Sequence, residues 1–228
     1  MKLLAIETAT EACSCALLID GHSTERYALA PREHNRLILP MVQSLLEEAG
    51  LALEQLDALA FGRGPGAFTG LRIAAGVVQG LAFGADLPVV PVSTLAALAQ
   101  QALDETAAPQ VFACLDARMD EVYWGVYGRG GEGTAQLLGQ ELVAPAGAVP
   151  LPGEGWGVGL GSGWSRYGAL LADRLGNRLT AVLQDRFPRA AAVARLGAEG
   201  FRLGRAVAAE QAVPVYLRDQ VARQPRAE

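Results

Sequence analysis

Two short stretches of the sequence carry the residue types that a phosphate- or nucleotide-binding cleft uses. Residues 61–70 (FGRGPGAFTG) hold four glycines between an apolar run of strand length and an apolar run of helix length, which predicts a strand-to-helix turn. Such a turn points free backbone N–H groups and the positive end of the helix dipole at an anion. Residues 7–11 (ETATE) follow the first apolar strand and add a carboxylate and two hydroxyls.

These stretches predict a phosphate-facing site in which an acid holds Mg²⁺ through water while hydroxyl and amide groups cradle phosphate. The candidate residues are Glu7, Thr8, Thr10, Gly64, Gly66, Thr69 and Asp116. The turn is not a P-loop, because it ends in Thr69-Gly70-Leu71 and the only lysine of the chain is Lys2. A plain connection at the glycines, and a solvated or turn-capping acid at each strand end, are the open alternatives.

No catalytic set can be completed from the side chains present. A Ser/His/Asp or Cys/His arrangement needs a histidine, and the chain has only His22, after a hairpin glycine, and His34, in the first turn of a helix. Cys13, Cys15 and Cys114 lack the spacing of metal ligands, so no metal site is expected. Cys13 and Cys15 fall on one face of a strand, as small buried hydrophobic residues do.

The charge distribution argues against a stand-alone nucleic-acid-binding protein. The net charge is −5, with 8 Lys/Arg and 18 Asp/Glu in residues 1–165 but 11 Arg and 6 Asp/Glu in residues 166–228. Phosphate neutralisation supplies most of the affinity for nucleic acid, so we expect RNA to contact the basic part only within a larger assembly. Without a signal-peptide pattern or an apolar run near 18 residues, we expect a cytoplasmic protein with no membrane contact.

Hydrophobic periodicity and turn residues predict alternating strands and helices. The expected strands cover residues 2–6, 13–19, 26–29, 56–61, 89–92, 111–115 and 122–127, with a short strand or loop at 182–183. The expected helices cover residues 31–49, 67–83, 95–103, 166–175 and 190–207. Residues 144–164 hold seven glycines and three prolines and are expected to form a loop. Residues 214–218 are expected to be extended.

The order of these elements indicates an internal duplication. Residues 111–128 repeat the plan of residues 3–21, in which a strand, an acid-led polar connection, a second strand and a glycine turn follow one another. We therefore expect an α/β protein with two lobes, residues 1–105 and 106–228, in which helix 190–207 crosses back to the first lobe. The polar connection at 116–121 (DARMDE) forms either an internal ion-pair network or a docking surface, and we favour the network.

Two helices carry more apolar surface than one core contact requires. The apolar side chains of helix 31–49 spread over roughly 200°, twice the width of an ordinary buried stripe. Helix 67–83 is similar, with Arg72 and Gln79 as its polar stripe. Either the second lobe covers both helices or a partner does, and we favour a partner. The expected interface residues are Leu37, Met41, Leu45, Arg72, Ala74, Val77, Gly80 and Leu81.

Four runs, spread in order along the chain, resemble the TsaB (YeaZ) family. They are residues 4–14 (LAIETATEACS), 64–72 (GPGAFTGLR), 116–124 (DARMDEVYW) and 214–219 (PVYLRD). The second and third runs are the specific ones. Glu7 departs from the family pattern, because an aspartate is usual at that place.

The resemblance implies an actin/hexokinase-like (ASKHA) fold with ribonuclease-H-like lobes, each a mixed sheet flanked by helices. It also implies a role in placing a threonylcarbamoyl group on N6 of the adenosine next to the anticodon in tRNAs that read codons beginning with A. The chain would be a non-catalytic scaffold or activator that pairs with the catalytic protein TsaD through helices 33–49 and 67–83, joins the ATPase TsaE, and forms a homodimer when alone.

The same resemblance bears on the missing chemistry. Catalytic relatives carry a His-x-x-x-His metal pair where this chain has Thr94 and Leu98, neither of which replaces an imidazole. A pseudo-enzyme is therefore expected, with no catalytic residues, no metal and no required cofactor. ATP or ADP would bind at the complex rather than at this chain alone. The alternative function is an ATP-dependent small-molecule kinase or nucleotide hydrolase of the same fold.

Overall fold

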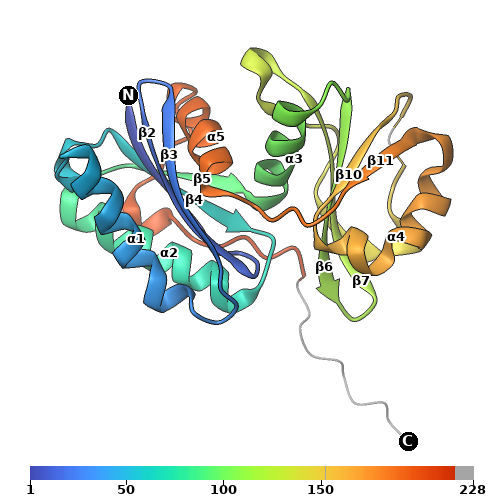
Figure 1. The fold of residues 1–228 in the computed structure, drawn as a ribbon, viewed down its shortest axis with the longest axis horizontal. Helices are drawn as coiled ribbons and strands as arrows, with labels where there is room; N and C mark the ends of the chain where they lie inside the picture. Colours follow the sequence, from blue (N-terminus) through green and yellow to red (C-terminus); the bar gives the residue numbers. More distant parts are fainter. Residues whose placement is uncertain (152, 219–228) are drawn as a thin grey trace, which may run out of the picture.

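The computed structural model describes residues 1–151 and 153–218, whose strands form two mixed sheets lying side by side (Figure 1). The first sheet comprises Lys2–Glu7 (β1), Ala12–Ile19 (β2), His22–Leu29 (β3), Ala58–Gly64 (β4) and Val89–Ser93 (β5). The second comprises Gln110–Arg118 (β6), Glu121–Arg129 (β7), Ala135–Leu137 (β8), Leu142–Pro145 (β9), Gly157–Leu160 (β10) and Leu179–Leu183 (β11). The helices are His34–Ala49 (α1), Phe68–Ala85 (α2), Thr94–Glu105 (α3), Ser162–Leu175 (α4) and Ala190–Arg202 (α5).

The two sheets have the same plan, which confirms the duplication that the sequence indicates. The first has the order β3-β2-β1-β4-β5, with β1 antiparallel to β2 and parallel to β4. The second has the order β11-β10-β6-β7-β8, with β6 antiparallel to β7 and parallel to β10, while β9 also pairs with β7. The chain therefore has the two-lobed α/β fold, with ribonuclease-H-like lobes, that the resemblance implies.

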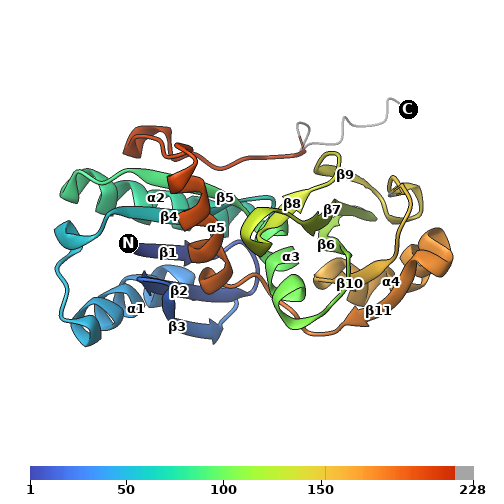
Figure 2. The same cartoon turned by 90° about the horizontal axis from the view of Figure 1, so that it is seen from above.

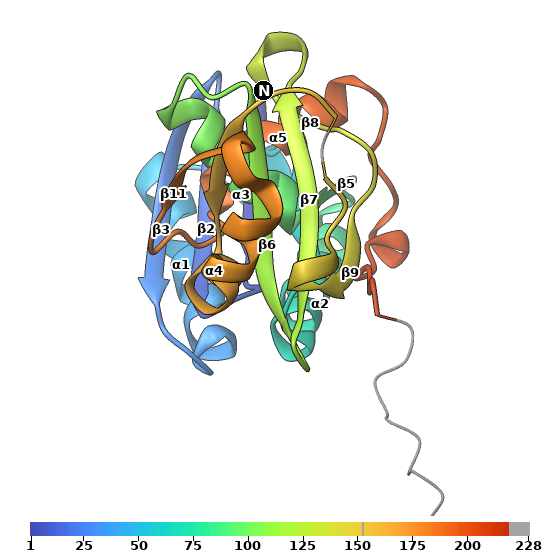
Figure 3. The same cartoon turned by 90° about the vertical axis from the view of Figure 1, so that its right-hand side faces the viewer.

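Alternating side chains of the central strands supply two cores on opposite faces of each sheet. In β1, Leu4 and Ile6 join the core under α1 and α2, whereas Leu3 and Ala5 join the core under α5. In the second sheet, one face packs on α3 and the other on α4, which lies toward the viewer in Figure 3. Burial on both faces explains why β1 and β6 are continuous apolar runs.

Helices α3 and α5 lie near the middle of the molecule. Each follows one sheet in the chain but packs mainly against the other sheet. Helix α3 precedes the second sheet and packs against β6, β7 and β10 of that sheet. Helix α5 follows the second sheet but returns to pack against β1, β2, β4 and β5 (Figures 1 and 2). Its Gly197 allows this close approach, since a Cβ there would lie 2.7 Å from the Cβ of Ala60.

The loop expected over residues 144–164 is wrong in its second half. Residues 157–160 form the fully buried strand β10 of the second sheet, and α4 begins at Ser162. The glycines of β10 make room for neighbours instead of loosening the chain. A Cβ at Gly157 would overlap the carbonyl of Gln110, and one at Gly159 would overlap the ring of Trp164.

Two helix ends also differ from the expected bounds. Helix α1 begins at His34 rather than Pro31, because Arg32 adopts a positive φ of 70° that no α-helix accommodates. Helix α5 ends at Arg202 rather than residue 207, where Gly204 turns the chain at φ 71°. Val207 then forms a β-bridge with Val89, at the outer edge of β5.

Candidate functional site

The Gly-rich turn packs directly on the turn that follows β1. The N–H group of Ala67 donates to the carbonyl of Ala9 (2.7 Å), and the hydroxyl of Thr8 donates to the carbonyl of Gly70 (2.8 Å). A Cβ at Gly66 would lie 2.5 Å from the Ala9 carbonyl oxygen, and one at Gly70 would overlap the Thr8 carbonyl. The structure thus brings the two predicted stretches together, and their glycines serve this backbone contact.

Glu7 lies beneath the turn and points inward. Its side chain is 1% exposed; the N–H of Ala9 donates to Oε1 (2.6 Å), and Thr94 Oγ1 donates to Oε2 (3.4 Å). A Cβ at Gly62 would overlap this carboxyl group, so glycine is needed there. Burial raises the pKa of Glu7 to about 7, although both hydrogen bonds act in the opposite direction. The carboxyl group therefore faces the interior of the first lobe and not solvent.

The other candidates of the first lobe occupy different settings. Thr10 accepts a hydrogen bond from the N–H of Ala12 (3.4 Å), which is a turn-capping role. Gly64 adopts a φ of 112°, and a Cβ there would lie 2.7 Å from the carbonyl oxygen of Val215. Thr69 is exposed in the first turn of α2. Of the predicted phosphate-site residues, Thr69 is exposed, whereas Thr10 and Gly66 are partly buried.

Asp116 belongs to the ion-pair network that we favoured from the sequence. Its carboxylate is 12% exposed and pairs with Arg118 (3.1 Å) and Arg166 (3.3 Å), and it accepts the N–H of Arg118 (2.9 Å). Glu121, at the other end of the same run, pairs with Arg218. The ion pairs that the network interpretation of residues 116–121 predicts are present, and the two arginines that pair with Asp116 lie on β6 and α4 of the second lobe.

Thr94 and Leu98 are both fully buried at the start of α3. The Thr94 hydroxyl is directed at Glu7, and the Leu98 side chain packs against the backbone around Gly161. Within residues 1–151 and 153–218, no group of three or more His, Cys, Asp or Glu side chains has metal-binding geometry. The cysteines are buried hydrophobic residues: burial raises the pKa of the Cys13 thiol to about 11 and that of Cys15 to about 12.

The surface of α1 and α2 partly matches the expected interface. Leu45 and Ala74 do not belong to it, because they are 1% and 0% exposed and pack in the core of the first sheet. Their helical positions fall within the apolar arc, and only the packing shows which part of that arc faces the sheet. The remaining expected residues are half-buried or exposed on these helices: Leu37, Met41, Arg72, Val77, Gly80 and Leu81.

The same surface has features that the sequence reasoning missed. Leu39 is 50% exposed and Phe83 is 84% exposed, which is unusual for large apolar side chains. A groove of about 370 Å³ runs between the ends of α1 and α2, and its lining is mostly apolar: Leu39, Val42, Gln43, Leu46, Glu47, Gly50, Leu51 and Leu81. Nothing lies within 4 Å of a Cβ built at Gly76, Gly80 or Gly84, so this stripe of α2 is open.

Helix α2 has the length and composition of a membrane-spanning helix, contrary to the expectation of no such run. It is 18 residues long with a mean hydropathy of 1.3. Six of its residues are nevertheless buried, and the helix packs on β4 and β1, so it is a core helix with one bare face.

A segment after α5 covers the polar stripe of α2. Gln79 Nε2 donates to the carbonyl of Ala212 (3.1 Å), and the N–H of Val215 donates to the carbonyl of Arg63 (2.8 Å). Arg72 Nε donates to the Tyr216 hydroxyl (3.4 Å), so Arg72 serves an intrachain contact. Figure 2 shows this segment running along α2 toward the second sheet. The sequence signals for it were the polar stripe of α2 and the extended piece expected at residues 214–218, and Asp219, which ends the fourth run, lies outside the described residues.

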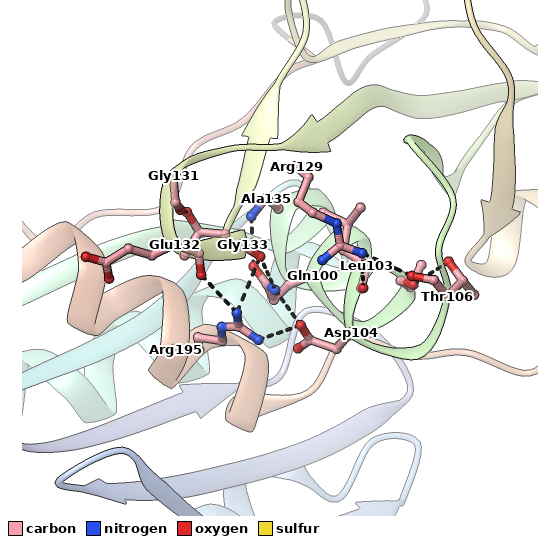
Figure 4. A network of polar contacts seen from close by, with 12 residues as sticks. Gln100, Leu103, Asp104, Thr106, Arg129, Gly131, Glu132, Gly133, Ala135 and Arg195 are labelled. Atoms are coloured by element: carbon pink, nitrogen blue, oxygen red, sulfur yellow. Dashed lines mark hydrogen bonds and ion pairs between the residues drawn. The ribbon is translucent and has the colours of Figure 1, made fainter.

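A polar network joins the two lobes beside α5. Gln100 of α3 donates to Asp104 (2.9 Å) and to the carbonyl of Gly133 (3.2 Å), and accepts the N–H of Ala135 (2.8 Å). Arg195 of α5 contacts Asp104 and the same Gly133 carbonyl (Figure 4). The loop between β7 and β8 is thereby tied to helices on both sides of the molecule's middle.

Comparison with known proteins agrees with this geometry. A family model described as TsaD, tRNA N6-adenosine threonylcarbamoyltransferase, matches residues 16–159. The tRNA threonylcarbamoyladenosine biosynthesis protein TsaB of Escherichia coli is 46% identical over 97% of this chain and 96% of that protein. The TsaB protein of Haemophilus influenzae is 40% identical over 97% of this chain and 95% of that protein.

Solved structures give the same assignment. YeaZ from Pseudomonas aeruginosa is 48% identical and superposes with a TM-score of 0.86, covering 95% of this chain and 99% of that chain. A second Pseudomonas aeruginosa structure, of a protein similar to YeaZ, is 49% identical with a TM-score of 0.88 over the same shares. The matching length, sequence identity and fold place this chain in the TsaB family of tRNA threonylcarbamoyladenosine biosynthesis proteins.

Proposed function

We propose that this protein is a non-catalytic subunit in tRNA threonylcarbamoyladenosine formation, which pairs with a TsaD-type transferase and supports its active conformation. The observation that carries the proposal is the uncovered apolar surface of α1 and α2. The groove between these helices, the open glycine stripe of α2, and the exposed Leu39 and Phe83 together present what a second pair of helices buries.

The setting of the acidic residues supports a non-catalytic role. Glu7 is buried, and burial raises its pKa to about 7, while Asp116 is paired with two arginines. Neither carboxylate is free to activate a nucleophile or to hold a metal beside a transferred phosphate. Thr94 and Leu98 are packed in the interior, so they leave no room for the metal pair of catalytic relatives.

The remaining partner assignments are parts of the same proposal. A TsaE-type ATPase joins the pair, and ATP or ADP binds at the assembled complex, where Thr69 and the α2 N-terminus are the accessible groups of this chain. In the absence of the transferase, the surface of α1 and α2 pairs with a second copy. The protein acts in the cytoplasm.

The test is a charge placed on the open face of α2. Val77→Arg should weaken pairing with the transferase by at least tenfold while the monomer stays folded, because an unpaired charge would be buried in the seam. Leu170→Arg is the matched control, since Leu170 is 54% exposed on α4 of the other lobe. Pairing is measured by calorimetry with purified transferase, and folding by thermal unfolding.

Unchanged transferase affinity of the Val77→Arg variant would show that the partner docks elsewhere. ATP turnover by the isolated chain, abolished by Glu7→Ala, would instead favour a kinase or nucleotide hydrolase. Leu45→Arg is no test of pairing, because Leu45 lies in the core and its replacement should unfold the first lobe.

A further inference from the structure

One rim of the molecule gathers exposed aromatic rings and arginines from three distant parts of the chain. Phe68, in the first turn of α2, is 53% exposed, and Tyr216 is 42% exposed. Their ring centroids lie 5.5 Å apart, and the Arg72 guanidinium sits 3.9 Å from the centre of the Phe68 ring. Arg72 has no carboxylate partner within the described part of the chain.

The same rim continues onto the hairpin between β6 and β7. Arg218, two residues after Tyr216, pairs with Glu121, donates to the carbonyl of Arg118 (3.4 Å) and contacts Met119 Sδ (3.3 Å). Arg118 in turn shares Asp116 with Arg166. These contacts define one continuous patch, the aromatic–arginine surface, which consists of Phe68, Arg72, Arg118, Met119, Arg166, Tyr216 and Arg218.

The hairpin tip is held in a conformation that side chains seldom adopt. Arg118, Met119 and Asp120 have φ values of 64°, 54° and 61°, three successive left-handed residues without a glycine. Such backbone is costly and recurs where a side chain must be held in a fixed position. Here it leaves the Arg118 side chain 71% exposed and Met119 50% exposed.

The charge of this surface is opposite to that of the chain as a whole. Four arginines face three carboxylates, Asp116, Asp120 and Glu121, whereas the chain carries a net charge of −5. Rings that stack on bases, set among guanidinium groups that contact phosphates, are what single-stranded nucleic acid binds. A net positive surface on an otherwise acidic chain favours a polyanion over an ordinary protein partner.

We propose that the aromatic–arginine surface binds single-stranded RNA, with bases stacking on Tyr216 and Phe68 and phosphates contacting Arg118 and Arg72. This inference rests on the proposed role in tRNA modification, and it makes an unpaired tRNA loop the RNA concerned. Because the rest of the chain is acidic, the affinity of the isolated protein is low and rises when the transferase contributes further contacts.

The experiment measures binding of an RNA stem-loop with the sequence of an anticodon arm to the full-length chain, alone and paired with its transferase. Tyr216→Ala should weaken binding by about tenfold, the loss expected for one stacked base, whereas Tyr216→Phe should bind as the parent does. Arg118→Gln should lower the slope of log affinity against log salt by about one. The matched controls lie outside the surface: Trp156→Ala, 47% exposed, and Arg186→Gln, an exposed arginine paired with Glu105.

Pairing with the transferase is measured on the same samples, so the two proposals fail separately. Stem-loop binding unchanged in both Tyr216→Ala and Arg118→Gln would overturn the inference. Equal loss in the controls, or equal affinity for a blunt duplex of the same stem, would also overturn it. Loss of transferase affinity in Tyr216→Ala with RNA binding intact would make this a protein-docking surface instead. If Val77→Arg still binds the transferase with unchanged affinity, the proposed function is contradicted but the RNA-binding inference is not.

Discussion

At the scale of single residues, Glu7 has the most unusual environment, a carboxyl group buried without a cation. Burial raises the pKa of Glu7 from its ordinary value of 4.5 to about 7 in the folded protein. Between pH 4.5 and pH 7, a larger fraction of folded than of unfolded molecules therefore carries the proton on Glu7. The contribution of Glu7 to the free energy of unfolding is therefore greatest below about pH 4.5, and it falls as the pH rises toward 7.

This linkage gives the first prediction. Glu7→Gln removes the titrating group but keeps an oxygen to accept the Ala9 N–H. The difference in unfolding free energy between pH 5 and pH 8 should shrink by up to about 3 kcal/mol relative to the parent, and the variant should be the more stable of the two at pH 8. Urea unfolding at both pH values measures this, with exposed Glu47→Gln as the control. Parallel stability curves for parent and Glu7→Gln would show that the carboxyl group is not buried.

The composition of the site could be predicted from the sequence, but its orientation could not. The motifs identified Glu7, Thr8 and the glycines as neighbours, and the structure places them together. Whether the carboxyl group points outward or inward depends on the missing Cβ of Gly62, a residue 55 positions away. The sequence shows that residue 62 is a glycine, but it does not show that the Glu7 side chain occupies the space beside it.

At the scale of elements, the glycines of α2 divide into two kinds, and this gives the second prediction. A Cβ at Gly70 would overlap the Thr8 backbone, so Gly70→Ala should destabilise the protein by about 3 kcal/mol. Gly76 meets nothing within 4 Å, so Gly76→Ala should stabilise the monomer by about 1 kcal/mol through helix propensity. Chemical denaturation of both variants measures the difference, and equal effects would contradict the packing of α2 on the turn after β1.

Gly76→Ala carries a further, separate expectation for pairing. If the open stripe of α2 admits a partner helix, the added methyl group should weaken transferase binding even though it stabilises the monomer. This is the third prediction, and calorimetry with the transferase measures it. Leu170→Ala on α4 is the control, since it changes an exposed apolar residue of the other lobe. If Gly76→Ala binds the transferase more tightly than the parent does, the partner docks on a face other than the open stripe of α2.

Most elements followed from periodicity because their buried faces are continuous along the chain. Strands β8, β9 and β10 are the exceptions. The sequence of β10, Gly-Val-Gly-Leu, follows a Gly- and Pro-rich stretch and is typical of a loop. Its glycines are explained only by the Gln110 backbone and the Trp164 ring, which other elements bring to it. The covering segment after α5 was missed for the same reason, because its contacts with Gln79 and Arg63 are distant in sequence.

At the scale of the whole molecule, the network between the lobes rests on a buried amide (Figure 4). Gln100 is 0% exposed and satisfies a carbonyl and an N–H of the loop between β7 and β8. The fourth prediction is that Gln100→Leu costs about 2 to 3 kcal/mol and speeds hydrogen exchange at residues 131–135, because the Ala135 N–H loses its acceptor and the Gly133 carbonyl keeps only its longer contact with Arg195. Arg195→Ala should cost less than about 1 kcal/mol, since the Arg195–Asp104 pair is about 40% exposed. Equal costs would assign the connection to the ion pair instead.

The position of α5 also bears on how the chain is made. All five strands of the first sheet are complete by Ser93, yet one of its faces is covered mainly by residues 190–202. During translation this apolar face stays largely uncovered until residues 190–202 have left the ribosome. The core between the first sheet and α5 is thus completed late, although its strands come first in the chain. A nascent chain released before residue 190 would leave Leu3, Ala60 and Val90 exposed to chaperones or to aggregation.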